Sequence, residues 1–303
     1  MLTSGLPDAL SDGVNALLWS LWTEIGVSGW DRHHEDWHVD VEPLVLFTSS
    51  FSNQDCRLKI EVLDWCRHYG KYVAVPRIEN LILRWPSHSI DTWNVFAGVI
   101  QANGGPSFGV IGTPEKILLS GKSRLNPYKR PSAITLTIRA MFGVNARADV
   151  INTLVLRPDS FQTAAMITRS SYFTKRHIWR ALEPFLDSGL LESRRTGNEI
   201  EVRLRNPGAL AALIGPAPTI VPPWTAVFPA LLSLLHDVPH LAGVSGVEGR
   251  VEVAAALRRA APWLHSLPVP WVDEVPEPGV LIDWLMMFVQ RLAIGDATLI
   301  RRQ

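Results

Sequence analysis

The fold is decided by residues 146–205, whose sequence is ARADVINTLVLRPDSFQTAAMITRSSYFTKRHIWRALEPFLDSGLLESRRTGNEIEVRLR. Apolar residues recur here at helical spacing in three successive groups. They are followed by a run in which charged and apolar residues alternate, as in a half-buried strand. The segment therefore predicts three short helices and then a β-hairpin.

The first two predicted helices are short. The first, Ala146–Leu156, ends where Arg157 precedes Pro158, because the residue before a proline avoids the helical region. The second, Phe161–Thr168, is rich in small residues that would let the next helix approach closely. We expect a polar break at 169–171.

The third predicted helix begins near Thr174, which is a favoured N-cap residue. If it is helical, Arg176 and Arg180 lie opposite its apolar face. Pro184 should kink or end the helix, because proline lacks the backbone donor. The expected buried face consists of Ile178, Ala181, Leu182, Phe185 and Leu186.

A hairpin is predicted over Glu192–Leu204, after a helix end at Gly189. Its two strands flank a turn that contains glycine, and Arg194 and Arg195 lie near the tip. We expect no other clear strands, apart from a short third one before Ala146.

This order of elements resembles winged-helix regulators of the ArsR and MarR kind, over residues 139–205 only. The resemblance implies that the third helix enters the major groove of double-stranded DNA while the wing lies along the backbone or minor groove. It also implies a homodimer on pseudo-palindromic sites. The DNA-binding residues expected from it are Lys175, Arg176, His177, Arg180, Arg194 and Arg195.

Charge is unevenly distributed along a chain whose formal net charge is zero. Residues 1–121 hold 8 Lys and Arg against 14 Asp and Glu, and residues 206–303 hold 6 against 8. Residues 122–205 hold 15 against 7. Clustered positive charge is what neutralisation of phosphate requires, so this basic block supports nucleic-acid binding independently of the helix pattern.

The predicted fold class is mainly α, with a central winged helix-turn-helix between two helical domains. The expected boundaries are an N-terminal domain 1–121, a basic connector and winged helix 122–206, a Pro-rich linker 207–223 and a C-terminal domain 224–303. The connector would lie near the DNA backbone or pack on the first domain. The C-terminal helices could fold alone, dimerise or pack on the N-terminal domain. Helices are expected at 11–27, 43–51, 55–69, 77–85, 92–102, 114–119, 224–235, 246–264 and 279–293.

His34 and His38 are four residues apart and match the pattern His-Glu-x-x-His. On a helix, this spacing could hold a metal ion. Asp40 and Pro43 follow closely, however, and leave room for barely two helical turns. We therefore expect a structural role for both histidines, with no metal and no cofactor bound.

No apolar run approaches the length of a membrane span, and the first residues lack the basic region of a signal peptide. Cys56 and Cys66 are too few for a disulfide framework, and we expect both to be reduced core thiols. The sequence thus predicts a cytoplasmic protein without a membrane segment.

The leading functional interpretation is a DNA-binding transcriptional regulator that is not an enzyme. A non-catalytic module, antitoxin-like or accessory to a defence system, could instead use the winged helix to hold a protein partner. A metal-dependent enzyme at His34, Glu35 and His38 is a third interpretation, without a second catalytic motif to support it.

Overall fold

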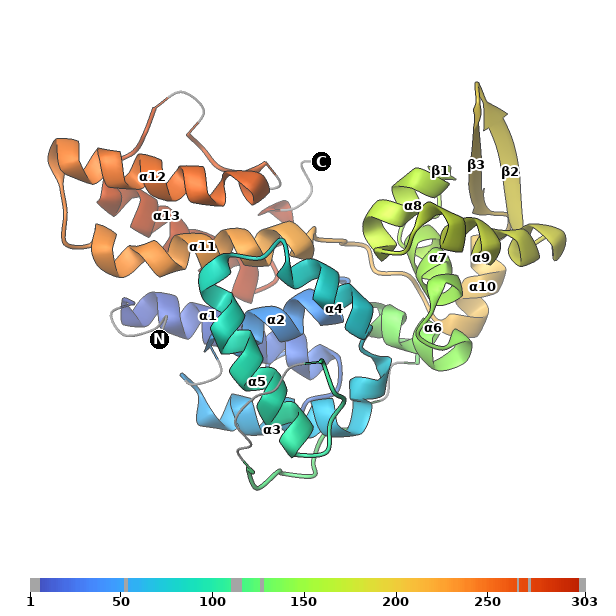
Figure 1. The fold of residues 1–303 in the computed structure, drawn as a ribbon, viewed down its shortest axis with the longest axis horizontal. Coiled ribbons are helices and arrows are strands. Elements are labelled where there is room, and N and C mark those ends of the chain that lie inside the picture. The colour runs from blue at the N-terminus through green and yellow to red at the C-terminus, as the bar shows by residue number, and fades with distance from the viewer. Residues whose placement is uncertain are drawn as a thin grey trace.

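The computed structural model describes residues 6–51, 54–109, 116–125, 128–265, 267–271 and 274–299. Within them the chain is mainly helical, with a small three-stranded antiparallel sheet. Figure 1 shows a helical body and a second unit beside it that carries the sheet. Each of the two has its own hydrophobic core.

The helical body combines segments from both ends of the chain. Helix α1 packs against α13, and α2 packs against α11. Of the arrangements open to the C-terminal helices, the structure shows packing on the N-terminal ones within a single core. The described parts of segments 1–121 and 224–303 therefore share one hydrophobic interior. The body's α-helices are α1 (Asp8–Glu24), α2 (Val41–Phe51), α3 (Cys56–Tyr69), α4 (Val75–Ile82), α5 (Ile90–Ala102), α11 (Trp224–Leu241), α12 (Gly246–Leu264) and α13 (Pro278–Ala293).

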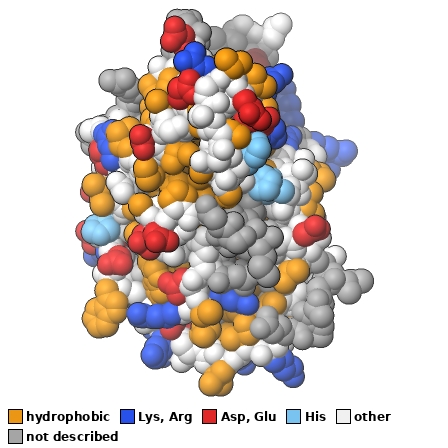
Figure 2. Space-filling view, turned by 90° about the vertical axis from the view of Figure 1, so that its left-hand side faces the viewer, with side chains coloured by type: hydrophobic (Ala, Val, Ile, Leu, Met, Phe, Trp, Pro, Cys, Tyr) orange, Lys and Arg blue, Asp and Glu red, His pale blue; other side chains and the backbone are white. Residues whose placement is uncertain are grey.

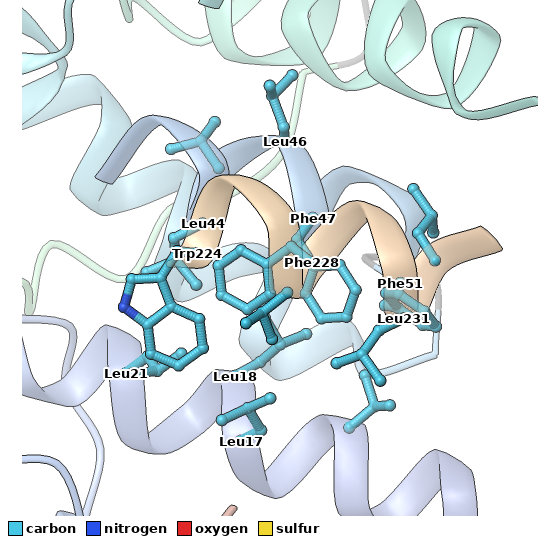
Figure 3. Packing of buried hydrophobic residues seen from close by; sticks show 14 of the residues in the cluster. Leu17, Leu18, Leu21, Leu44, Leu46, Phe47, Phe51, Trp224, Phe228 and Leu231 are labelled. Carbon is cyan, nitrogen blue, oxygen red and sulfur yellow. The ribbon is translucent and has the colours of Figure 1, made fainter. Parts of the chain in front are cut away.

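Aromatic rings from α2 and α11 occupy the centre of this core (Figure 3). The Phe228 ring stacks on Phe47 and on Trp224, with centroid separations of 4.6 Å in both cases. Leucines of α1, such as Leu18 and Leu21, close the core from the other side. Burial of these rings removes apolar area from water, which stabilises the fold. Aromatic pairs also have preferred orientations, so the stacked rings help to fix how α2 and α11 pack.

The second unit contains α6 (Ile134–Phe142), α7 (Ala146–Val155), β1 (Gln162–Thr163), α8 (Ala164–Ser171), α9 (Lys175–Asp187), β2 (Leu191–Thr196), β3 (Glu199–Leu204) and α10 (Pro207–Ile214). Strand β3 lies between β1 and β2, antiparallel to both. The hairpin and the helix beginning after Thr174 are confirmed. Helix α9 continues past Pro184 to Asp187.

Two predictions in this unit are wrong. Residues 162–163, expected in a helix, pair with Val202 and Glu201 of β3, so the third strand follows α7 and does not precede it. The Thr163 side chain accepts a hydrogen bond from the Met166 amide, which places the start of α8 at residue 164. Helix α8 also runs through the expected break to Ser171, and Tyr172, which follows it, has a φ of 61°.

The first half of the predicted linker 207–223 is helical. Residues 207–214 form α10, whose Leu210 and Ile214 are buried in the core of the second unit. Ile220 then pairs with Trp37 of the body in a parallel bridge. The connector at 122–125 packs on the body, where the Ser123 amide donates to Asp64 at 3.0 Å.

A buried charged cluster joins the two units. Glu42 of α2 accepts hydrogen bonds from Arg139 of α6 at 2.5 Å and from the amide of Ala74 at 2.7 Å. Arg77 of α4 contacts the same carboxylate, and Asp149 of α7 lies 3.6 Å from Arg139. Helix α6 also contributes side chains to both cores. The second unit is therefore anchored to the body by charge as well as by apolar contact.

The structure differs from the predictions at 114–119 and at one of the two cysteines. The described part of the helix expected at 114–119, residues 116–119, is not helical, and 114–115 lie outside the described residues. Cys66 is buried, as expected, but Cys56 is exposed. Short 3-10 turns lie at Gly70–Tyr72, Ser87–Ser89, Pro131–Ala133 and Ala297–Leu299. Among the described helices, none combines the length and apolarity needed to cross a bilayer.

Candidate nucleic-acid interface

Helix α9 presents a basic face to solvent. Thr174 caps the helix, and its hydroxyl accepts a hydrogen bond from the His177 amide at 3.3 Å. The buried residues Ile178 and Leu182 fix the rotation of the helix about its axis. The side chains of Lys175, Arg176, His177 and Arg180 are consequently all exposed.

Arg176 and Arg180 lie one helical turn apart on this face. Within the described residues, neither of them takes part in an ion pair, although Glu183 and Asp187 follow on the same exposed side. The first half of the helix face is therefore basic and the second half is acidic. Contacts with an anion would be expected at the N-terminal half, where the helix dipole also favours negative charge.

A hollow of about 430 Å³ separates the start of α7 from α9. Arg147 joins His177 and Arg180 in lining it. Asn145 caps α7 by accepting hydrogen bonds from the amides of Arg147 and Ala148. Arg147 could not be assigned to this face from the sequence, because nothing local links it to a helix that begins 28 positions later. Its position in the first turn of a helix, where a cation opposes the dipole, was the available signal.

The hairpin separates its two arginines. Because successive residues of a strand point to opposite faces, Arg194 and Arg195 lie on different sides of the ribbon. The Arg194 side chain donates to Glu201 at 2.5 Å and lies 4.0 Å from the centroid of the Phe161 ring. Arg195 lies opposite Ile200, on the face that is buried nearer the base of the hairpin. The structure therefore does not bring the two side chains together.

The hairpin is largely neutralised by its own acidic residues. Arg203 pairs with Glu192 on the same face as the Arg194–Glu201 pair. The hydrogen bond from Arg194 lowers the pKa of Glu201, which keeps this carboxyl ionised. Of the arginines in the hairpin, Arg195 is left as the one outside an ion pair among the described residues.

The second unit retains an excess of exposed positive charge after these pairs are removed. Exposed cations without an ion pair within residues 146–205 outnumber the exposed acidic groups by two to one. The cations are Arg147, Arg157, Arg169, Lys175, Arg176, Arg180, Arg195 and Arg205, and the acidic residues are Asp159, Glu183, Asp187 and Glu199. An excess of this kind suits a polyanionic partner.

His34 and His38 are buried in an irregular segment, not on a helix. The two rings bond to different groups: His34 contacts Ser20 at 2.7 Å and the Leu292 carbonyl at 2.8 Å, whereas His38 contacts Thr135 at 2.8 Å. Burial lowers the pKa of each to about 4. Both histidines therefore tie segments of the fold together as neutral rings. In the part of the chain that is described, no cluster of three metal-binding side chains occurs.

Comparisons with known proteins do not assign a family. Neither family models, nor curated proteins, nor solved structures give a match to this chain.

Proposed function

We propose that the second unit is a winged helix-turn-helix that binds double-stranded DNA, and that the protein is a DNA-binding transcriptional regulator. The order of elements from α7 to β3 supports this proposal, because a strand and two helices precede a hairpin, as in winged helices. In this arrangement α9 is the recognition helix and the β2–β3 hairpin is the wing.

The observation that carries the proposal is the exposed pair Arg176 and Arg180 on α9. A helix fits the major groove of B-DNA, where an arginine can donate two hydrogen bonds to a guanine. Lys175 and His177 flank the pair at the capped end of the helix. In this proposal, Arg147 and Arg195 contact neighbouring phosphates. Such contacts position the protein on the duplex without reading its sequence.

A duplex-binding titration at two salt concentrations tests the proposal. The test variant replaces Arg176, Arg180 and Arg195 with alanine. Loss of the phosphate contact of Arg195 should lower the dependence of log K on log salt by about 0.9. Loss of the base contacts of Arg176 and Arg180 should weaken binding at both salt concentrations. The control variant loses the same charge from the helical body, through alanine at Arg32, Arg57 and Arg84.

Weaker binding of the test variant alone is the expected result. Equal affinity of both variants and the wild type at both salt concentrations would remove the α9 face from DNA binding. A uniform loss in both variants would point to non-specific attraction by net charge.

One observation favours a second candidate, docking of a protein partner. Glu183 and Asp187 continue the face that begins with Arg176 and Arg180. A surface with both signs of charge suits a partner with a complementary pattern better than a uniform polyanion. In that case, Glu183→Lys would leave duplex binding unchanged, whereas under the DNA proposal it would strengthen binding.

A further inference from the structure

Helix α12 exposes two valines, Val247 and Val251, on its outer face. Val253, Ala256 and Ala260 are buried on the side of the helix that packs against α11. At 100° per residue, the opposite side carries a stripe of four residues. The stripe consists of Val247, Val251, Ala254 and Arg258.

The first half of this stripe lines an open groove of about 560 Å³. Val247 is 84% exposed and Val251 is 58% exposed, while Val275 lies across the groove. Arg250 and Glu277 form an ion pair along one side. Single exposed apolar residues are ordinary, but several gathered around one groove indicate a surface that becomes covered.

A face of this kind can pack against the same face of a second copy. When two copies of α12 pack antiparallel about a two-fold axis, Val251 faces Ala254 of the other copy and Val247 faces Arg258. An isologous contact requires self-complementarity of this kind.

The charges at the ends of the stripe are complementary in the same pairing. Glu248 lies beside the stripe at its N-terminal end, and Arg258 lies at its C-terminal end. The Arg258 side chain donates to the Ala254 carbonyl at 3.2 Å, and neither Arg258 nor Glu248 forms an ion pair within the described residues. Antiparallel pairing brings each Glu248 next to the Arg258 of the other copy, twice per dimer.

We infer that the outer face of α12 is a self-association surface, whose partner is a second copy of this chain packed antiparallel about a two-fold axis. Figure 2 faces the end of the molecule where α11 meets α12, and hydrophobic and charged side chains lie side by side over its upper half. The inference does not depend on DNA binding. In Figure 1 α12 and the second unit lie at opposite ends, so pairing leaves α9 uncovered.

Sedimentation equilibrium of the full chain over about 1 to 300 µM tests the inference, because a contact made through one helix is expected to be weak. The wild type should change from monomer to dimer across this range. Val251→Glu places two carboxylates in the contact and should weaken association at least about tenfold. Val95→Glu is the matched control, since Val95 on α5 is 55% exposed and lies outside the stripe.

Charge reversal tests the antiparallel register. Glu248→Arg and Arg258→Glu should each weaken association, and the double variant should recover it, because both pairs are then reversed. Circular dichroism and thermal unfolding verify that each variant is folded. A wild type that stays monomeric throughout the range, equal effects of Val251→Glu and Val95→Glu, or a double variant weaker than either single one would overturn the inference.

Discussion

Replacement of Glu42 by glutamine should destabilise the contact between the two units. The substitution keeps the shape of the side chain but removes the charge that faces Arg77 and Arg139. Glu42 and both arginines are almost completely removed from water. Two guanidinium groups would then remain buried, with Asp40 and Asp149 as their carboxylates.

The expected cost is about 3–5 kcal/mol, which is typical for removing one partner of a buried ion pair. The charges around Glu42 lead to a similar figure. Burial alone would raise the pKa of Glu42, but Arg139 and Arg77 outweigh it and lower the pKa to about 2. Against an unfolded value of about 4.3, this difference corresponds to roughly 3 kcal/mol. The contribution is complete above pH 4.3 and is lost as the pH falls toward 2, so pH 7 is suitable for the measurement.

Urea unfolding followed by tryptophan fluorescence is the assay. Trp179 is the only tryptophan in residues 122–223, so a Trp179→Phe background reports the helical body alone. Glu277→Gln is the control, because it breaks the exposed pair with Arg250 and should cost less than about 1 kcal/mol. If Glu42→Gln and Glu277→Gln cost the same, the buried cluster does not hold the units together.

Three further results are expected. The wild type should lose stability as the pH falls from about 6.5 to 4, because burial lowers the pKa of His34 to about 4 and the unfolded chain takes up the proton first. His34→Gln should reduce this loss. Equal dependence of stability on pH in the variant and the wild type, measured by calorimetry, would contradict the prediction. Arg180→Ala should weaken duplex binding by about 1–3 kcal/mol in a fluorescence titration. Arg157→Ala removes another exposed arginine and is the control. Equal losses of affinity in the two variants would refute the reading of a base by Arg180. Gly295→Ala should lower the melting temperature far more than Gly197→Ala. The added Cβ would lie 2.0 Å from the His33 carbonyl oxygen at position 295, whereas it meets nothing at position 197. Because both glycines have positive φ, similar decreases in melting temperature would refute the steric argument.

The candidate interface was partly predictable, because its determinants are local. The cap at Thr174 and the apolar spacing that follows it fix which side of α9 is buried, and hence that Arg176 and Arg180 are exposed. The state of Arg194 was not predictable in the same way. Its ion pair with Glu201 depends on the register of the hairpin, and its stacking depends on Phe161, more than thirty residues earlier.

The sequence by itself determined the mainly helical class, most helix positions, and the hairpin that follows the capped helix, because periodicity, caps and turn residues act within a few positions. Only the tertiary structure decided that 162–163 form a strand, since two residues become a strand only when β3 lies beside them. It also decided that α1 and α13 share one core and that Glu42 meets Arg139. These contacts join residues far apart in the chain, and their energy comes from burial and charge pairing that no local pattern encodes.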